Sequence, residues 1–278
     1  MEHALICIAG KNRIAVEGAG HILKSHPKVK LVGCCNQNDG GRDGLQPSFR
    51  KWCLENNVPL LSLPEVLAQE QLIFISLEFD KILPVHVSNT KKLFNIHFSL
   101  LPKYKGMYTS CLPILYGEKS TGVSLHQIDA GIDTGPILDQ QEFPICPQDT
   151  ARDLYMKYLF HGFGIFKKNL SSLLQGGFSA SPQPSFGASY FSKDAVDFKK
   201  IAIDLQKTAF EVSCQIRAFT FQEFQMVELF GRTVTGCEIT GMRSTKKPGT
   251  LLSQTKEALI LATIDFDLII FAKETPKL

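Results

Sequence analysis

The first half of the chain alternates short apolar runs with amphipathic segments, and this alternation limits the possible folds more than any other feature. Residues 14–25 show the amphipathic kind, because Ala15, Ala19 and Ile22 fall on one face of a helix. Such an alternation is typical of an α/β fold built on a parallel sheet. We therefore predict strands at 4–9, 29–35, 73–77, 93–96, 122–127 and 137–144, and helices at 14–25, 49–56, 64–69 and 150–174.

The second half of the chain has a different composition. Residues 176–193 are rich in Gly, Ser and Pro, which predicts a linker or an irregular loop. Residues 203–217 have a helical period, and short strands separated by turns are predicted from residue 223 onward. We therefore divide the chain into a first domain, 1–180, and a second domain, 181–278. The second domain holds the linker, a helix and a small β-rich part. Its exposed strand faces or edges predict a symmetric homodimer.

Composition excludes several classes of protein. The 278 residues include 30 Lys and Arg and 27 Asp and Glu, and the net charge of +3 is too small to predict binding to nucleic acid or to a membrane surface. The start lacks the basic segment of a signal peptide, and no stretch is long and apolar enough to span a membrane. The eight cysteines lack the short paired spacing of zinc ligands, so we expect reduced, mostly buried thiols in a cytoplasmic protein.

Polar groups that can support catalysis are densest between residues 95 and 135. Asn95 and His97 lie two apart at the end of an apolar strand, so their side chains are expected to face one pocket. Alternatively, His97 is a strand-end histidine that bonds a backbone carbonyl. Asp129 and Asp133 lack the oxygen series of a calcium loop, and turn capping is the alternative reading of each.

A second candidate region follows the first predicted strand. Lys11 and Asn12 stand at the start of a helix, where backbone N–H groups attract anions. The sequence there is not the glycine fingerprint of dinucleotide-binding proteins, and the second strand ends in amides rather than an acidic residue. The side chains of Asn36 and Asn38 therefore suggest contact with a base or a sugar.

Three runs, taken in order, are NIHFSLLPKYKG at 95–106, GEKSTGV at 117–123 and DAGIDTGP at 129–136. Together they resemble the folate-dependent formyltransferase superfamily. The resemblance implies a Rossmann-like, mostly parallel sheet domain followed by a small helix plus β-rich subdomain. The runs AGKN at 9–12, QPSF at 46–49 and RAFTF at 217–221 are similar to those of nucleotide-sugar N-formyltransferases that use dTDP-linked amino sugars.

The resemblance also implies roles for individual residues. Asn95 stabilises an oxyanion, and His97 accepts a proton from the attacking amine. Asp133 orients the His97 ring, raises its proton affinity through opposite charge and helps to relay protons through water. N10-formyltetrahydrofolate is the implied co-substrate, and no metal is required. Its contacts are expected at Phe79, Ile82, Leu83, His126, Asp129 and Gly131. The sugar nucleotide is expected at Lys11, Asn12, Asn36, Asn38, Tyr104, Phe219 and Phe221, although the last two aromatic side chains fit a core position as well.

The function implied by the resemblance is formylation of a dTDP-linked amino-dideoxyhexose for lipopolysaccharide O-antigen synthesis. We place dTDP-4-amino-4,6-dideoxyglucose first and a dTDP-3-amino-3,6-dideoxyhexose second. Two alternatives remain open at this point. One is a methionyl-tRNA or other formyltransferase, because the runs at 248–252 and 258–263 are similar to the β-barrel of the tRNA enzyme. The other is a catalytically silent folate or nucleotide sensor on the same fold.

Overall fold

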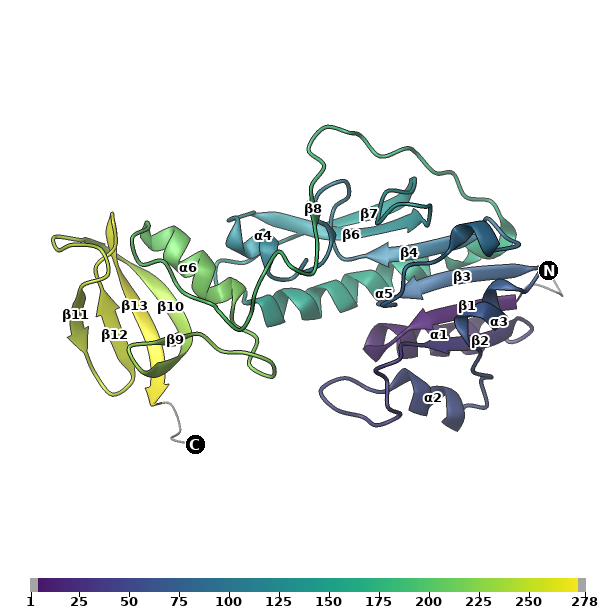
Figure 1. Ribbon diagram of the computed structural model, residues 1–278, viewed down its shortest axis with the longest axis horizontal. Coiled ribbons are helices and arrows are strands. Elements are labelled where there is room, and N and C mark those ends of the chain that lie inside the picture. The colour runs from purple at the N-terminus through teal and green to yellow at the C-terminus, as the bar shows by residue number, and fades with distance from the viewer. Residues whose placement is uncertain (1–4, 275–278) are drawn as a thin grey trace. The chain divides into compact units, whose positions relative to one another are not determined.

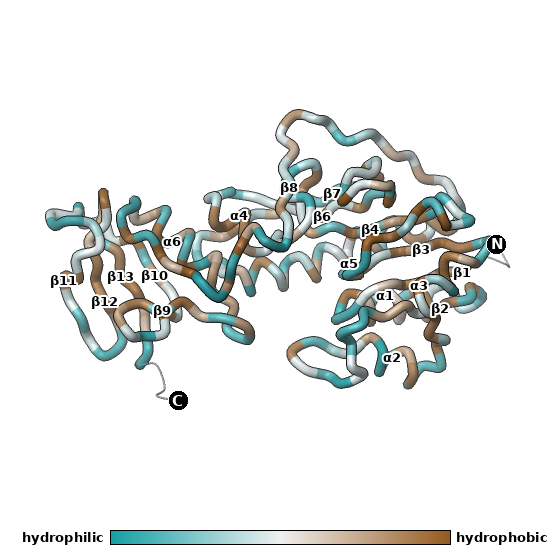
Figure 2. Tube along the Cα trace, viewed as in Figure 1, coloured by the Kyte–Doolittle hydropathy of each residue, from teal (hydrophilic) through white to brown (hydrophobic). Residues whose placement is uncertain are grey.

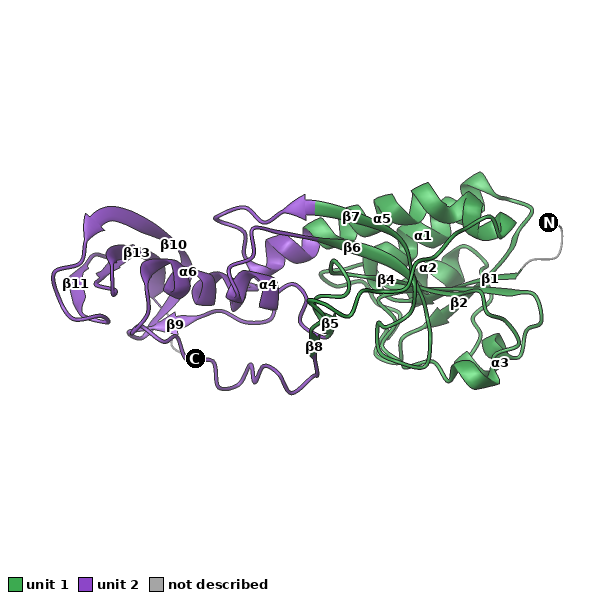
Figure 3. Ribbon diagram, turned by 90° about the horizontal axis from the view of Figure 1, so that it is seen from above, with its two compact units in different colours: residues 1–106, 122–142, 157–190 green, residues 107–121, 143–156, 191–278 purple. Residues whose placement is uncertain are grey.

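A computed structural model describes residues 5–274 of the chain, which form two compact units. Figure 3 shows the first unit in green, residues 1–106, 122–142 and 157–190, and the second in purple, residues 107–121, 143–156 and 191–278. Each unit consists of three segments that are separate in the sequence but pack together in space. The division into domains at residue 180 stays a prediction. None of the helices within 5–274 is both long and apolar enough to cross a membrane.

The first unit is built on a six-stranded sheet with the order β2-β1-β3-β4-β6-β7 (Figure 1). Strands β1, β2, β3 and β4 are parallel, and β6 runs antiparallel to β4. This confirms the predicted α/β class and its mostly parallel sheet. The strands are β1 (Leu5–Gly10), β2 (Lys30–Cys35), β3 (Leu72–Leu77), β4 (Leu93–His97), β6 (Ser120–Gln127) and β7 (Ile137–Pro144).

The central strands are buried on both faces, as the continuous apolar runs require. Ile6 and Ile8 alternate along β1 with Cys7 and Ala9, and all four side chains are buried. Cys7 and Ala9 share a core cluster with Val66 of a short helix. Figure 2 shows β1 and β3 as predominantly apolar stretches. The helices and a 3-10 turn of this half are α1 (Asn12–Ser25), α2 (Phe49–Glu55), α3 (Leu63–Leu67), η1 (Val85–Val87) and α5 (Ala151–Gln175).

Helix α1 packs by the face that the sequence predicts. Its buried residues include Ala15, Ala19 and Ile22, and its His21 ring makes edge contacts with Phe163 and Phe166 of α5. The strands and helices predicted in this half all appear in the structure, with ends that differ by one or two residues. Residues 176–193 are mostly irregular, as expected from their composition, with the short strand β8 (Tyr190–Phe191) at their end.

The second unit carries a five-stranded sheet with the order β11-β12-β13-β10-β9. Its strand pairs are antiparallel, and helix α6 packs on its core through Val212 and Ile216. The predicted β-rich tail is therefore present. The short strand β5 (Lys105–Gly106) belongs to the first unit. The elements of the second unit are α4 (Leu112–Leu115), α6 (Ala209–Ala218), β9 (Glu228–Leu229), β10 (Arg232–Arg243), β11 (Leu251–Gln254), β12 (Ala258–Leu261) and β13 (Phe266–Glu274).

The helix predicted at 203–217 was placed too early. Helix α6 begins at Ala209, because the Thr208 hydroxyl accepts from the backbone N–H of Glu211 and the Glu211 carboxylate accepts from the backbone N–H of Thr208. Ile203 and Leu205 still pack against the core of the second unit. The apolar spacing of these two residues therefore reflects their packing against the core and does not indicate a helix.

Gly10 is the position where the first unit is least tolerant of a side chain. A Cβ atom there would lie 1.8 Å from the carbonyl oxygen of Leu77 on the neighbouring strand β3. We expect Gly10→Ala to lower the free energy of unfolding by more than about 3 kcal/mol, because backbone must move to relieve the overlap. Denaturant unfolding measures this. Gly44→Ala is the matched control, since a Cβ there meets nothing within 4 Å. Equal losses in the two variants would contradict the account.

Candidate active site

The order of the strands determines where a site can form. Strand β1 lies between β2 and β3, so the strands that follow it in sequence are placed on its two opposite sides. Ligands of open α/β sheets bind at such a switch point, beyond the carboxyl ends of the strands. His97 is the last residue of β4, and Asn95 lies two residues before it. Asp133 lies in the loop after β6, with its carboxylate 3.2 Å from Asn95 Nδ2 and 3.4 Å from His97 Nδ1. The structure therefore brings together the three residues predicted to be catalytic.

His97 is held by a backbone carbonyl. Its Nε2 lies 2.8 Å from the oxygen of Tyr104, and because a carbonyl only accepts, Nε2 carries the hydrogen. Tyr104 has a φ of +57°, and its own N–H donates to Ser189 Oγ at 2.8 Å. The alternative reading of His97 as a carbonyl-bonded strand-end residue is thus correct about Nε2. The other ring nitrogen, Nδ1, lies 3.4 Å from Asp133 Oδ2. In the neutral ring this nitrogen has the lone pair.

Asp133 is fixed by backbone and amide donors. Its Oδ2 accepts from the N–H of Gly106 at 2.9 Å, and its backbone oxygen accepts from Gln183 Nε2 at 2.8 Å. Its φ of +53° is unusual for a residue other than glycine, and such conformations occur preferentially at functional sites. We predicted that Asp133 orients the His97 ring and raises its proton affinity through opposite charge. The ring lies closer to the Tyr104 oxygen, at 2.8 Å, than to Asp133 Oδ2, at 3.4 Å, and both roles of Asp133 stay predictions.

Asn95 connects the other two residues. Its Nδ2 lies 3.2 Å from Asp133 Oδ1 and 3.1 Å from Nε2 of His126. His126 faces Asn95 because β6 is antiparallel to β4 and pairs these two residues in register. The amide nitrogen of Asn95 therefore faces a carboxylate oxygen of the loop after β6 and a ring nitrogen of the neighbouring strand.

The charges of the site suit proton transfer to His97. Burial lowers the pKa of His97 from 6.5 and outweighs the Asp133 carboxylate and the Tyr104 carbonyl, which both favour the protonated ring. Burial raises the pKa of Asp133, but the neighbouring His97, His126 and Gly106 N–H outweigh it, and the pKa is well below its usual range. At neutral pH the pair is thus a neutral imidazole beside a carboxylate.

The pH profile of the enzyme should report this arrangement. We expect kcat/KM to fall on the acid side with an apparent pKa below 6.5, because the predicted role of His97 as proton acceptor requires a neutral ring and its pKa is lowered. Asp133 and His126 are the titratable groups that face it. An NMR titration of His97 in the ligand-free protein separates this ionisation from that of any bound molecule. A His97 pKa above 6.5 would contradict the assignment.

The comparisons with known proteins point to one family. A model described as formyl transferase matches residues 63–168. WlaRD, a sugar 3-N-formyltransferase solved with dTDP and 5-N-formyl-THF, is 41% identical, covers 99% of each chain and has a TM-score of 0.92. This chain belongs to the sugar N-formyltransferases. The N-formyltransferase of Helicobacter canadensis, solved with folinic acid and dTDP-3-aminofucose, is 40% identical with a TM-score of 0.91, over 97% of this chain and 100% of that chain.

Methionyl-tRNA formyltransferase is a more remote relative of this sugar N-formyltransferase. The enzyme of Coxiella burnetii is 27% identical over 277 residues, which is 92% of this chain and 86% of that protein. A 4-N-formyltransferase from Francisella tularensis is 20% identical with a TM-score of 0.66, over 81% of this chain and 91% of that chain, and shows that the fold is shared.

The predicted nucleotide residues of this formyltransferase lie at the switch point, with different exposures. Lys11 is the residue that precedes α1, and Asn12 Nδ2 donates to Glu78 Oε2 at 3.2 Å. Asn36 is fully buried, and its Nδ2 donates to the backbone oxygen of Glu78 at 2.9 Å. Its side chain therefore ties the ends of two strands together, whereas Asn38 is exposed. Glu78, which accepts hydrogen bonds from both Asn12 and Asn36, was not predicted as part of this region, although it directly follows the predicted strand at 73–77.

Tyr104, Phe219 and Phe221 are not equally available for stacking. Tyr104 is buried in the first unit. In the second unit, Phe219 packs against the core, and Phe221 lines a pocket of about 220 Å³ together with Tyr108, Phe198 and Phe224. The core alternative fits Phe219, and the stacking role of all three stays a prediction.

The predicted folate residues differ in burial as well. Phe79 is half-buried against the core, Leu83 belongs to that core, and Ile82 is 73% exposed. Asp129 caps its turn, because its Oδ1 accepts from Gly131 N and from Thr134 Oγ1, as its alternative reading predicts. The folate contacts stay predictions. Among residues 5–274, no group of three or more His, Cys, Asp or Glu side chains is arranged to hold a metal ion.

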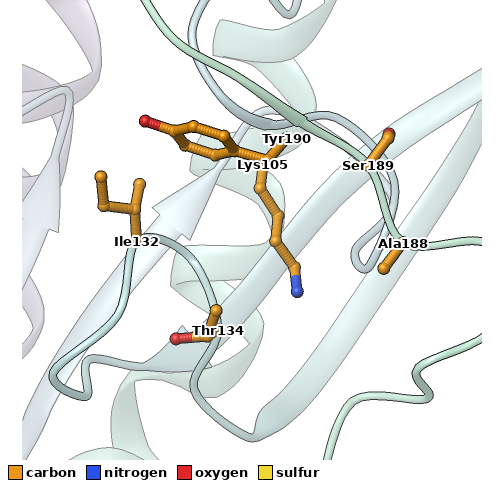
Figure 4. A pocket seen from close by; sticks show the side chains of 6 residues that line it. All are labelled: Lys105, Ile132, Thr134, Ala188, Ser189 and Tyr190. Atoms are coloured by element: carbon orange, nitrogen blue, oxygen red, sulfur yellow. The ribbon is translucent and has the colours of Figure 1, made fainter.

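A pocket of about 380 Å³ opens beside Asp133 in the first unit (Figure 4). Ile132 and Thr134, the two neighbours of Asp133 in sequence, form part of its wall, and the side chains of Lys105 and Tyr190 form another part. Sequence reasoning missed Lys105, Tyr190 and Gln183. Lys105 lies within the run 95–106 that carries part of the family resemblance, and this position was the sequence signal that could have indicated it. Tyr190 and Gln183 lie in the segment predicted as a linker.

Proposed function

We propose that this enzyme transfers the formyl group of N10-formyltetrahydrofolate to the amine of a dTDP-linked 3-amino-dideoxyhexose. The observation that carries the proposal is the assembly of Asn95, His97 and Asp133 at the strand ends of a chain 41% identical to a sugar 3-N-formyltransferase. From the sequence alone we placed the 4-amino sugar first. The 3-amino sugar now takes that place, because a relative 40% identical was solved with dTDP-3-aminofucose.

The chemistry needs a base, a donor and a counter-charge. The sugar amine attacks the formyl carbon with its lone pair, and the C=O bond electrons move onto the oxygen. One N–H of Asn95 donates to that oxyanion. His97 Nδ1 takes the proton that the amine nitrogen loses, and Asp133 Oδ2, 3.4 Å away, stabilises the resulting imidazolium. The intermediate then collapses, the bond to N10 breaks, and His97 returns the proton to the leaving nitrogen.

The neighbourhood of the triad offers surfaces for both substrates. The 380 Å³ pocket combines the Tyr190 ring with the Lys105 ammonium, a pairing that suits a ligand with a flat part and an anionic part. The Lys11 and Asn12 turn remains our proposal for the phosphates of the sugar nucleotide. With Asn36 buried, we propose Asn38 as the nearer candidate for a polar contact with substrate.

A panel of sugar nucleotides tests the specificity. We expect kcat/KM to be highest for the dTDP-3-amino sugar, because an amine moved by one ring carbon is misaligned with His97 and the formyl carbon. Misplacement by an ångström can cost about 100-fold. The comparison uses dTDP-3-amino, dTDP-4-amino and GDP-4-amino sugars with the same folate. A preferred dTDP-4-amino sugar would overturn the regiochemistry, and a GDP sugar preferred tenfold or more would overturn the nucleotide.

Methionyl-tRNA is the second acceptor to test, since the Coxiella burnetii tRNA enzyme aligns with 92% of this chain. Formylation of charged initiator tRNA at a rate above that of every amino sugar would favour this function. The O-antigen role, the cytoplasmic location and the homodimer stay predictions. Sedimentation at micromolar concentration decides the oligomeric state.

A further inference from the structure

His126 lies next to the catalytic residues without direct access from solvent. It is the partner of Asn95 in the register of β4 and β6, and only 2% of its surface is exposed. Such burial leaves the ring little surface for a contact with folate. Both ring nitrogens of His126 instead have hydrogen-bond partners inside the site.

One tautomer of His126 fits its surroundings. The ring Nδ1 lies 2.7 Å from the backbone oxygen of Gln127. A carbonyl oxygen only accepts, so Nδ1 carries the hydrogen, and Nε2 of the neutral ring has the lone pair. That lone pair faces Asn95 Nδ2 at 3.1 Å. His126 therefore accepts from Asn95.

The two acceptors of Asn95 lie on the same side of its amide nitrogen. The distances from Asn95 Nδ2 are 3.1 Å to His126 Nε2 and 3.2 Å to Asp133 Oδ1, and those two atoms are 3.5 Å apart. In such a nearly equilateral triangle the acceptors subtend roughly 60°, whereas the two N–H bonds of an amide diverge by about 120°. A single N–H directed between the two acceptors reaches both of them. In that arrangement the second N–H points away from them.

We propose that His126 is a positioning residue that acts through Asn95. It holds the shared N–H, together with Asp133, so that the second N–H is presented to the oxygen of the formyl group. His126 Nε2 and Asp133 Oδ1 also disfavour the flipped orientation of the Asn95 amide, because the amide oxygen would then face two atoms that only accept hydrogen bonds. The inference deepens the proposed formyl transfer and rests on it.

Loss of the His126 ring should change the direction of the amide rather than its presence. With Asp133 as the remaining acceptor, the shared N–H turns toward Oδ1, and the second N–H turns with it. The donor is then misaligned with the charge that develops in the transition state. An interaction made mainly in the transition state affects kcat more than KM.

The test compares an apolar and a polar replacement. His126→Leu removes the acceptor and is expected to lower kcat by about 10- to 100-fold with little change in KM for either substrate. His126→Gln places an amide oxygen near the former Nε2 and should recover most of the loss. Val123→Ala, on the same strand and fully buried, is the control for packing, and should lower the melting temperature while leaving kcat intact.

A double-mutant cycle separates positioning from other roles. In an Asn95→Ala background, His126→Leu should cause no further loss of kcat, because its target is gone. A full additional loss in that background would overturn the inference. So would a rise in KM for folate at unchanged kcat, which would indicate a folate contact instead.

A spectroscopic measurement makes the inference independent of turnover. In ¹⁵N spectra of the free enzyme, His126 should have a protonated Nδ1 and an accepting Nε2, and Asn95→Ala should shift the Nε2 signal. A protonated Nε2 would overturn the inference even in an active enzyme. Inactivity of the wild type on every amino sugar would overturn the proposed function, while the ¹⁵N result would still decide whether His126 holds Asn95.

Discussion

Replacing His97 with asparagine is expected to lower kcat by about 10²- to 10⁴-fold while KM for both substrates stays nearly unchanged. The reason is that Nδ1 has the free lone pair beside Asp133, whereas Nε2 is already bonded to the Tyr104 carbonyl. Asparagine can keep a polar contact in the loop but does not accept a proton near neutral pH. The effect therefore belongs to the transition state and not to binding.

Single-turnover kinetics measure this effect without interference from product release. Calorimetric titration of the sugar nucleotide is the control, and it should give similar affinities for the wild type and the variant. Asp133→Asn should lose turnover to a comparable extent, because it removes the charge that stabilises protonated His97. Near-normal kcat in either variant would remove that residue from the mechanism.

Replacing Asn95 with alanine is expected to lower kcat by about 10²- to 10³-fold, since it removes the proposed donor to the oxyanion. Asn95→Asp should be at least as damaging. It replaces the amide nitrogen, 3.2 Å from Asp133 Oδ1, with an oxygen that repels the carboxylate. The order expected for kcat is thus wild type, then alanine, then aspartate.

The melting temperatures of both Asn95 variants serve as the control, because a buried like-charge pair also destabilises the fold. Alanine tests the donor alone, so its kcat is the decisive value. If Asn95→Ala retained wild-type kcat, the oxyanion would have another donor, and the triad would reduce to His97 and Asp133.

The strands of the first unit were predictable because burial on both faces leaves continuous apolar runs. The start of α6 was not predicted correctly, because Ile203 and Leu205 are apolar for packing and not for helix. The correct start had a sequence signal in Thr208 and Glu211, which have the spacing of a capping box.

Asn95 and His97 were predictable because residues two apart on a strand face the same way, and Asp133 followed from the family resemblance. The groups that orient them were not predictable. The Tyr104 oxygen and the Gly106 N–H are backbone atoms, and their directions depend on conformations such as the φ of +57° at Tyr104. The pair of Asn95 and His126 depends on the antiparallel register of β6, which the existence of the strand does not determine.

The most direct test of the central claim is transfer of a labelled formyl group. The enzyme is incubated with N10-formyltetrahydrofolate that carries ¹³C in the formyl carbon and with a dTDP-3-amino sugar, and the products are analysed by mass spectrometry. We expect a sugar nucleotide heavier by one labelled formyl group, formed one for one with tetrahydrofolate, and almost none with His97→Asn. Release of labelled formate with an unchanged sugar nucleotide would contradict it.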